Sequence, residues 1–385
     1  MSFESLTPSQ KQVLNLIRIN GEMSGADIAR YTGLQPSTIV YIVKTLSSLE
    51  YIEVSKTGIS TSKGGKRPTL LKINPNTGII IGVEVLLEAF RVSVINFAGE
   101  HVFQNKIELQ RPIDKSNIIP ELVKLISSIK QNKELKKKNI LGIGIALPGL
   151  VSSSKGAVLY STKLNLHNFL LKETLETQLK LPIIIANDAN AGVLGVKWFP
   201  DNQDAKANNI IYLMYNQDAP NLGSGIVVNN QIYEGISGTA GEITLNLPIL
   251  SELINETNKK FIDQKKMSPN DTISSKLHLN ELIELAIEKN SLIAENILGN
   301  LCQSISKIVS FLVGFMNPAH IVIGGDLAEF KILIDRYIFK QVTEQMPDYI
   351  SHGFVMPEIK ISRFGVYSVS VGATAIVLRE LYGVN

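Results

Sequence analysis

A chain of 385 residues with 44% apolar and 19% charged residues can bury two or three globular cores, which excludes an intrinsically disordered protein. Its net charge is only +3, and a single cysteine, Cys302, excludes both an internal disulfide and a zinc site made of several cysteines. No run of about 18 uninterrupted apolar residues occurs and the first ten residues are polar, so neither a membrane span nor a signal peptide is expected. The protein is predicted to be cytoplasmic.

The N-terminal segment predicts a helix-turn-helix. A helix is expected near residues 9–19, followed by two amphipathic helices at residues 24–31 and 36–49. The last two are joined by a tight turn in which Gly33 supplies the positive φ that other residues resist. The N-terminal end of the second helix of such a motif enters the DNA major groove. The predicted DNA contacts there are Gln35, Ser37, Thr38, Tyr41 and Lys44.

A basic hairpin follows this motif and favours a winged helix-turn-helix over an ordinary helical hairpin, which the turn spacing alone leaves open. Strands are expected at residues 51–54 and 67–73, around a glycine-rich loop at residues 56–65. Cationic side chains on such a loop can enter a narrow minor groove, and the predicted contacts are Lys63, Lys66 and Arg67. Residues 1–74 hold nine Lys and Arg against five Asp and Glu, so the positive charge lies where DNA contact is predicted.

Two similar α/β halves are predicted behind this module. The first has strands at residues 79–85, 90–96, 101–108, 140–146 and 182–186, and helices at residues 120–130, 169–179 and 190–198. The second has strands at residues 209–215, 225–228, 231–233 and 319–323, a polar loop with a short helix at 249–271, and two long helices within 281–315. Because the order strand-strand-strand-helix-strand-helix appears twice, we predict two lobes with a cleft between them.

Five segments of the chain together resemble the ROK family of bacterial sugar-responsive repressors and sugar kinases. They read GGKRP (64–68), ALPGLV (146–151), ANDANAG (186–192), YEGISGTAGEI (233–243) and NPAHIVIGGDL (317–327). Each is weak alone, but ANDANAG and GISGTAGEI at this separation are specific, and the resemblance covers nearly the whole chain. The winged module indicates the repressor branch, which includes xylose and N-acetylglucosamine repressors.

The resemblance implies an α/β fold in which a two-lobed actin/hexokinase/Hsp70-like (ribonuclease-H-like) domain follows the N-terminal winged helix-turn-helix. The DNA-binding domain is expected at residues 1–74. Lobe 1 is expected at residues 75–190, completed by a C-terminal helix at 366–385, and lobe 2 at residues 191–365, with the helices that form a dimer.

The family's sugar-binding positions correspond to Asn187, Asp188, Gly238 and Glu242 in this chain. Carboxylates and amides at strand ends suit this role because they can bind vicinal hydroxyl groups in pairs, and a charged acceptor strengthens each bond. The glycine-rich loop at residues 235–241 lets the backbone approach a ligand closely. The alternative is that Asn187 and Asp188 only cap the next helix.

The phosphate loops of the kinase branch are altered here. Where the kinases resemble Asp-x-Gly-x-Thr, this chain has Glu84, Leu86 and Glu88, and a second carboxylate there repels a triphosphate. Asp218 adds negative charge near the second phosphate loop. We therefore expect no ATP binding, no phosphoryl transfer, no cofactor and no enzyme activity. Asp188, the catalytic base of the kinases, would serve only as a sugar ligand.

The zinc motif of many family members is also absent. Leu245 stands where those proteins have a histidine after Gly-Glu-Ile, and no cysteine cluster follows, so no metal is expected. The same change removes a histidine and a glutamate that usually contact the sugar. It leaves open a regulator that has lost sugar sensing.

The leading hypothesis is a sequence-specific DNA-binding transcription regulator, a repressor of sugar-metabolism genes, with a sugar or sugar phosphate effector in the interlobe cleft. One winged module has a small footprint, so a homodimer or tetramer is expected to bind a pseudo-palindromic double-stranded operator. The alternatives are a ROK sugar kinase with a fused DNA-binding module and the regulator without sugar sensing. No membrane partner is expected.

Overall fold

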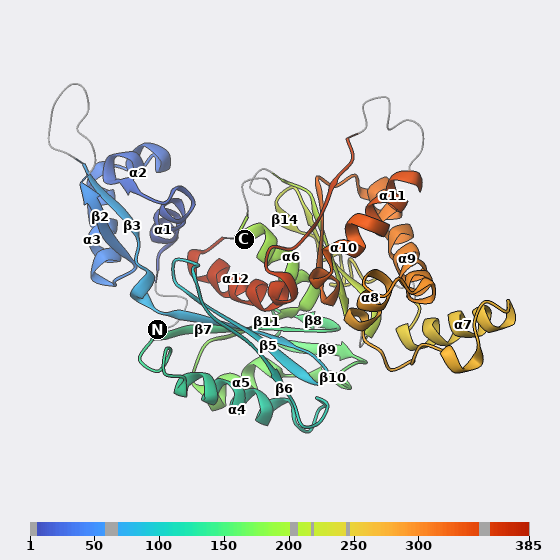
Figure 1. Ribbon diagram of the computed structural model, residues 1–385. Helices are drawn as coiled ribbons and strands as arrows, with labels where there is room; N and C mark the ends of the chain where they lie inside the picture. Colours follow the sequence, from blue (N-terminus) through green and yellow to red (C-terminus); the bar gives the residue numbers. More distant parts are fainter. Residues whose placement is uncertain are drawn as a thin grey trace. The chain divides into compact units, whose positions relative to one another are not determined.

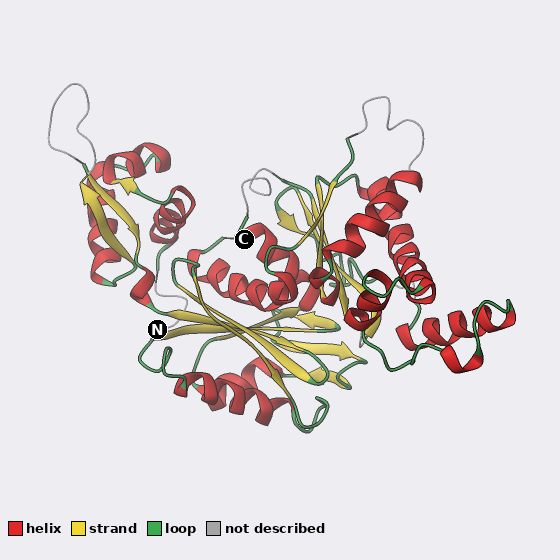
Figure 2. Cartoon of the chain, viewed as in Figure 1, coloured by secondary structure: helices red, strands yellow, loops and turns green. Residues whose placement is uncertain are grey.

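The structure is a computed structural model of the 385-residue chain and describes residues 6–57, 68–200, 207–216, 219–243, 247–345 and 355–384. The chain folds as two compact units, whose elements are labelled in Figure 1 and coloured by type in Figure 2. Unit 1 contains Met1–Ala191 and Ser370–Asn385. Unit 2 contains Gly192–Val369.

Unit 1 begins with the winged helix-turn-helix that the sequence predicts. Its helices are α1 (Pro8–Asn20), α2 (Gly25–Thr32) and α3 (Pro36–Ser48). Its strands β1 (Met23–Ser24), β2 (Ile52–Thr57) and β3 (Thr69–Ile73) pair antiparallel in the order β1-β3-β2. The residues that hold the helices together are fully buried and apolar, among them Val13, Leu14, Ile17, Ile28 and Leu46. The 3₁₀ turn η1 (Pro75–Thr77) then leads into the rest of unit 1.

The rest of unit 1 is a five-stranded sheet with helices on both faces (Figure 2). The strands are β4 (Ile79–Val85), β5 (Ala89–Asn96), β6 (His101–Glu108), β7 (Ile140–Leu147) and β11 (Ile183–Asn187). The helices are α4 (Ile118–Gln131), α5 (Leu171–Leu179) and α12 (Ser368–Tyr382). Because strand side chains alternate, Ile79, Ile81 and Val83 form a core with α4 and α5, whereas Gly82 lies against α12 on the other face.

Unit 2 repeats this topology. Its strands are β12 (Ile210–Asn216), β13 (Ala219–Val228), β14 (Gln231–Ile232), β15 (His320–Gly325) and β16 (Glu358–Ile361). The strand orders β6-β5-β4-β7-β11 and β14-β13-β12-β15-β16 match strand for strand, with antiparallel pairs followed by parallel pairs in both sheets. The repeated order expected from the sequence is therefore confirmed.

The helices of unit 2 are α7 (Leu250–Asp263), α8 (Leu279–Ile287), α9 (Leu292–Met316), α10 (Lys331–Leu333) and α11 (Phe339–Gln345). Most of the apolar residues of α9 are buried in the core of the unit. Helix α9 is also long and apolar enough to cross a membrane, but 56% of its most apolar window is buried inside the protein, as in the core helix of a globular domain.

Several parts of the fold differ from the sequence-based expectation, and β16, α10 and α11 were not predicted. The strands β8 (Leu150–Ser152), β9 (Ala157–Ser161) and β10 (Leu166–Phe169) form a small sheet of their own that was not predicted. Helix α7 is longer than the short helix expected in a polar loop, because its few apolar residues, Leu250, Leu253 and Ile254, share one buried stripe. Helix α8 has nine residues and is not a long helix. Helix α6 (Asp188–Trp198) follows β11 and continues from unit 1 into unit 2.

Candidate DNA-binding and ligand-binding sites

The turn between α2 and α3 is built by local hydrogen bonds. Ser24 begins α2 by accepting from the amide of Asp27, at 3.1 Å. The helix ends at Gly33, which has a φ of 70° and donates its amide to the Ala29 carbonyl at 2.9 Å. Thr32 Oγ1 donates to the Ile28 carbonyl at 2.7 Å. These contacts fix the turn in which the chain reverses direction, and so they position α3.

Helix α3 has one buried face and one exposed face. Ile39, Ile42 and Leu46 are buried, as predicted, whereas Val43 is only half-buried. The five residues proposed to contact DNA from this helix, Gln35, Ser37, Thr38, Tyr41 and Lys44, are all exposed, and Tyr41 is 68% exposed. Within the described residues no side chain caps the first amides of α3 at Gln35. An uncapped N-terminus leaves peptide N–H groups that can bind a phosphate.

The winged module also exposes apolar side chains that the sequence analysis did not single out. Val40 and Tyr31 are 68% and 63% exposed. The sequence indicates the exposure of Val40, because this apolar residue falls outside the buried stripe of α3. The three predicted wing contacts, Lys63, Lys66 and Arg67, lie outside the described residues.

In unit 1, Asn187 and Asp188 lie where β11 ends and α6 begins. Asn187 pairs in register with Leu147, so the ends of the parallel strands β11 and β7 are adjacent. The Asn187 side chain donates to the Gly149 carbonyl at 3.1 Å and accepts from the Asn190 amide at 3.0 Å. It therefore does cap α6, as the alternative proposed, and it also positions the loop that follows β7.

The Asp188 carboxylate is half-buried and accepts from the Ala189 amide at 2.8 Å. Burial raises the pKa of Asp188, and the nearby cation of Lys163 opposes part of this effect. A half-buried acceptor at the end of a strand can bind a hydroxyl group or a proton.

In unit 2, the glycine-rich loop has the backbone geometry that glycine permits. Gly235, Gly238 and Gly241 have φ values of 68°, 73° and 90°. A Cβ at Gly241 would lie 2.0 Å from the Ser224 carbonyl oxygen, so only glycine fits there. The next residue, Glu242, is exposed and forms a bridge with Gly223 of β13. The backbone thus places Gly238 and Glu242 on one short loop.

The turn between β4 and β5 is closed. The Leu86 amide donates to the Ala89 carbonyl at 2.9 Å, which makes a tight hairpin. The carbonyls of Leu87 and Glu88 accept amides from the segment after β6, at 2.7 and 2.8 Å. Phosphate loops bind through free backbone amides, and the Leu86 amide is already used within the hairpin.

A buried ion pair lies beside this turn, and the sequence analysis missed half of it. Glu84 and Arg91 face each other across β4 and β5, with 3.4 Å between Arg91 Nη1 and Glu84 Oε2. Their side chains are only 1% and 6% exposed. Hairpin symmetry is the signal that identifies Arg91, because residues 84 and 91 are equally far from the turn at residues 87 and 88.

Two of the positions discussed for the phosphate and zinc motifs are not described by the structure. Leu245 and Asp218 lie outside the described residues. Among the residues that the structure describes, no group of three or more His, Cys, Asp and Glu side chains could hold a metal ion. Cys302 is buried in α9, and this burial raises the pKa of its thiol to about 12, so it stays protonated at neutral pH.

Two stretches of the chain match known protein families. Residues 80–247 match the ROK family, and residues 4–58 match the MarR family. The xylose repressor of Caldicellulosiruptor bescii is 28% identical over 388 residues, which covers 96% of this chain and 95% of that protein.

Solved structures show the same fold. The crystal structure of a ROK family transcriptional regulator, a homologue of the Escherichia coli MLC protein, has a TM-score of 0.78 at 21% identity, and the match covers 97% of this chain and 96% of that one. A ROK family glucokinase from Streptomyces griseus, in complex with glucose and AMPPNP, has a TM-score of 0.64 at 17% identity. That match covers 78% of this chain and 99% of the kinase chain.

Proposed function

Because the chain carries a ROK-family domain behind a MarR-type winged helix-turn-helix, we propose that it is a transcriptional repressor whose DNA binding responds to a sugar. The exposed face of α3 carries this proposal. Ile39, Ile42 and Leu46 are buried in the module, and the polar residues at the N-terminal end of α3 are exposed and can reach base edges. Similarity to a xylose repressor along 96% of the chain supports the same function.

In the proposed complex, α3 lies in the major groove. Gln35, Ser37 and Thr38 would contact bases or phosphates near the helix start, and Lys44 would contact a phosphate. The exposed Val40 and Tyr41 offer apolar surface to thymine methyl groups. Lys63, Lys66 and Arg67 would contact the minor groove from the wing. The protein would act as a cytoplasmic homo-oligomer on a pseudo-palindromic operator.

The effector site is proposed to contain Asn187, Asp188, Gly238 and Glu242, in a cleft between the two ROK lobes. The carboxylates of Asp188 and Glu242 are hydrogen-bond acceptors that suit sugar hydroxyl groups. D-xylose is the first candidate because the repressor described above is named for xylose. D-glucose, N-acetyl-D-glucosamine and their phosphates are the next candidates.

Kinase activity is not part of the proposed function. The tight β4–β5 hairpin and the buried Glu84–Arg91 pair occupy the place where the kinase branch has its first phosphate loop. Arg91 is held by a carboxylate of the same chain, so it is not available to a nucleotide phosphate. The similarity to a glucokinase structure concerns the fold.

Fluorescence anisotropy on the DNA upstream of the protein's own gene tests this proposal. Purified protein is titrated at several salt concentrations, with and without D-xylose, D-glucose, N-acetyl-D-glucosamine or the corresponding sugar phosphates. We expect salt-dependent, sequence-specific binding that one sugar releases. Binding that no sugar alters would support the regulator without sugar sensing. Absence of specific binding, together with ADP formation from ATP and a sugar, would support the kinase.

Asp188→Asn and Lys155→Ala form a matched pair for the sugar site. Asp188→Asn keeps the shape of the side chain and removes its charge, whereas Lys155 is an exposed residue of a turn in unit 1. The first variant is expected to bind the operator but to require at least about tenfold more sugar for release, because a charge-assisted hydrogen bond is lost. The second is expected to behave like the wild type.

A further inference from the structure

An aromatic cluster joins the winged module to the C-terminal end of α12 within unit 1. Phe97, in the turn after β5, stacks on Tyr382 of α12 with ring centroids 5.2 Å apart and planes 8° apart. Tyr51 of the winged module also contacts Phe97, with ring centroids 5.2 Å apart and planes tilted by 47°. The guanidinium of Arg18 on α1 lies over the Tyr382 ring, 5.5 Å from its centre. We call Arg18, Tyr51, Phe97 and Tyr382 the junction cluster.

The junction cluster is buried and specific in its geometry. Phe97 is fully buried, and Tyr51 and Tyr382 are 5% and 1% exposed. The Tyr382 hydroxyl donates to the Phe97 carbonyl at 3.0 Å, and burial raises the pKa of this hydroxyl, so it remains a neutral donor. A stacked pair that also shares a hydrogen bond has one preferred arrangement, whereas a purely apolar contact is not directional.

A second set of contacts surrounds the junction cluster. Lys11 Nζ of α1 donates to the Glu380 carbonyl at 3.3 Å. Gly383, with a φ of 62°, follows α12, and a Cβ there would lie 2.5 Å from the Lys11 side chain. Glycine at this position therefore lets α1 and the end of α12 approach closely.

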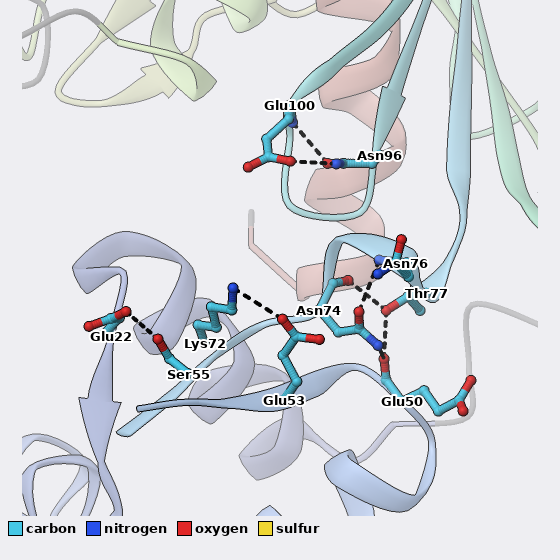
Figure 3. Close-up of polar contacts among 10 residues, drawn as sticks. All are labelled: Glu22, Glu50, Glu53, Ser55, Lys72, Asn74, Asn76, Thr77, Asn96 and Glu100. Atoms are coloured by element: carbon cyan, nitrogen blue, oxygen red, sulfur yellow. Dashed lines mark hydrogen bonds and ion pairs between the residues drawn. The ribbon is translucent and has the colours of Figure 1, made fainter. Parts of the chain in front are cut away.

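The linker at residues 74–78 is hydrogen-bonded both to the winged module and to the rest of unit 1. Figure 3 shows its contacts with the module, among Glu50, Asn74 and Thr77. The Glu50 carbonyl of the winged module accepts from Asn74 Nδ2 at 2.9 Å and from Thr77 Oγ1 at 2.6 Å. On the other side, the Asn139 carbonyl accepts from the Ile79 amide at 2.7 Å. The linker is therefore a short, hydrogen-bonded turn and not a free tether.

The backbone of helix α12 packs directly against the sheet of unit 1. A Cβ at Gly82 would lie 2.0 Å from the Ser370 carbonyl oxygen, and a Cβ at Gly144 would lie 1.9 Å from the Ala373 carbonyl oxygen. Ser93 and Ser370 share a buried hydrogen bond of 2.7 Å. Helix α12 starts at Ser368 in unit 2, where Tyr212 and Ser368 are joined by a hydrogen bond of 2.6 Å, and continues in unit 1 from Ser370.

We propose that α12 and the junction cluster transmit the ligand state of the ROK domain to the winged module, by fixing the angle at which that module is held. The inference rests on the proposed function. A helix that begins in one unit and ends in a stacked contact with the DNA-binding module is a continuous, stiff connection between the two. Ligand-dependent movement at its start would turn α1 and, through the module's core, α3.

Operator release by sugar tests the transmission. Three variants are compared with the wild type in the anisotropy assay: Tyr382→Leu, which removes the stack and the hydroxyl; Arg18→Leu, which removes the cation; and Arg363→Leu. The last is the matched control, because Arg363 lies over the Phe364 ring at 4.6 Å in unit 2 and is exposed. The sugar used is whichever of D-xylose, D-glucose and N-acetyl-D-glucosamine releases the wild type.

The first two variants are expected to bind both the operator and the sugar, but the effect of sugar on operator Kd should fall at least about tenfold. Coupling is reciprocal, so the effect of operator on sugar Kd should fall by the same factor. Arg363→Leu should couple like the wild type. Full coupling in Tyr382→Leu would overturn the proposal, even though the repressor function itself would stand.

Hydrogen exchange provides a second measurement that needs neither DNA nor sugar. If the junction cluster fixes the module, Arg18→Leu and Tyr382→Leu should speed amide exchange in α1, in the linker at residues 74–78 and in the last turn of α12. Exchange in α9 of unit 2 should not change. Unchanged exchange in α1 and the linker would refute the proposal whether or not a sugar effector is found.

Discussion

Replacing Arg91 by methionine should destabilise unit 1 strongly, because it leaves the Glu84 carboxylate buried without this cation. The two charged groups are 3.4 Å apart and at most 6% exposed. At an effective dielectric constant of about 20, their attraction is about 5 kcal/mol. Burial of both charges offsets much of that energy in the intact pair, but removing one partner of a buried pair typically costs about 3–5 kcal/mol.

Urea unfolding of the full-length protein, followed by far-UV circular dichroism, measures this loss. For an m value of about 2–3 kcal/mol/M, the midpoint of Arg91→Met should fall by roughly 1–2.5 M. The double variant Glu84→Met with Arg91→Met should recover most of the loss, because an apolar pair of similar size carries no buried charge. A single variant within about 1 kcal/mol of the wild type would show that the pair is not structural, and would make Arg91 a candidate phosphate ligand.

Three further predictions concern other parts of the chain. Gly144→Ala should lower the free energy of unfolding by at least about 3 kcal/mol, because its Cβ would lie 1.9 Å from a backbone carbonyl oxygen of α12. Gly299→Ala in α9 has open space around the new Cβ, so it should be neutral or raise the free energy of unfolding by up to about 1 kcal/mol. Urea unfolding measures both variants. Because the pKa of Asp188 is raised in the folded state, folding favours the protonated acid, and the wild type should lose stability as the pH rises through that pKa. Asp188→Asn should lose less stability than the wild type between about pH 4 and pH 7. Equal losses of stability in thermal melts would contradict this. Lys44→Ala should weaken operator binding and reduce the slope of log K against log salt by about one, as measured by anisotropy, and an unchanged slope would remove Lys44 from the phosphate contacts.

Most elements of the fold could be predicted from local patterns. Buried strands such as β4 and β7 are continuous apolar runs, and α3 shows one apolar stripe after a proline at its start. The short strands β8, β9 and β10 could not be predicted, because three to five residues with serine, lysine and glycine nearby carry no period that separates them from a loop. Helix α7 was underestimated because its polar residues outnumber its apolar ones.

The candidate sites depend on contacts that join distant parts of the chain. The exposed positions on α3 follow from its helical period, and the site motifs around Asn187 and Glu242 follow from the resemblance to the ROK family. Nothing local in the sequence links Arg18 to Tyr382, because these residues meet only when the last helix packs on the sheet. The pairing of Arg91 with Glu84 follows from the register of the β4–β5 hairpin, which the symmetry of the hairpin about its turn indicates.

The division of unit 1 along the chain has a consequence for its synthesis. All of Gly192–Val369 is translated between the sheet of unit 1 and the helix α12 that covers it. At about 5–20 residues per second, the winged module therefore waits on the order of ten seconds or more on the ribosome before Tyr382 emerges. During that time Arg18 and Phe97 have no aromatic partner from α12. A chain that stops before α12 would hold its recognition helix by the linker and the Tyr51–Phe97 contact alone, so we expect regulated DNA binding only from chains that include α12.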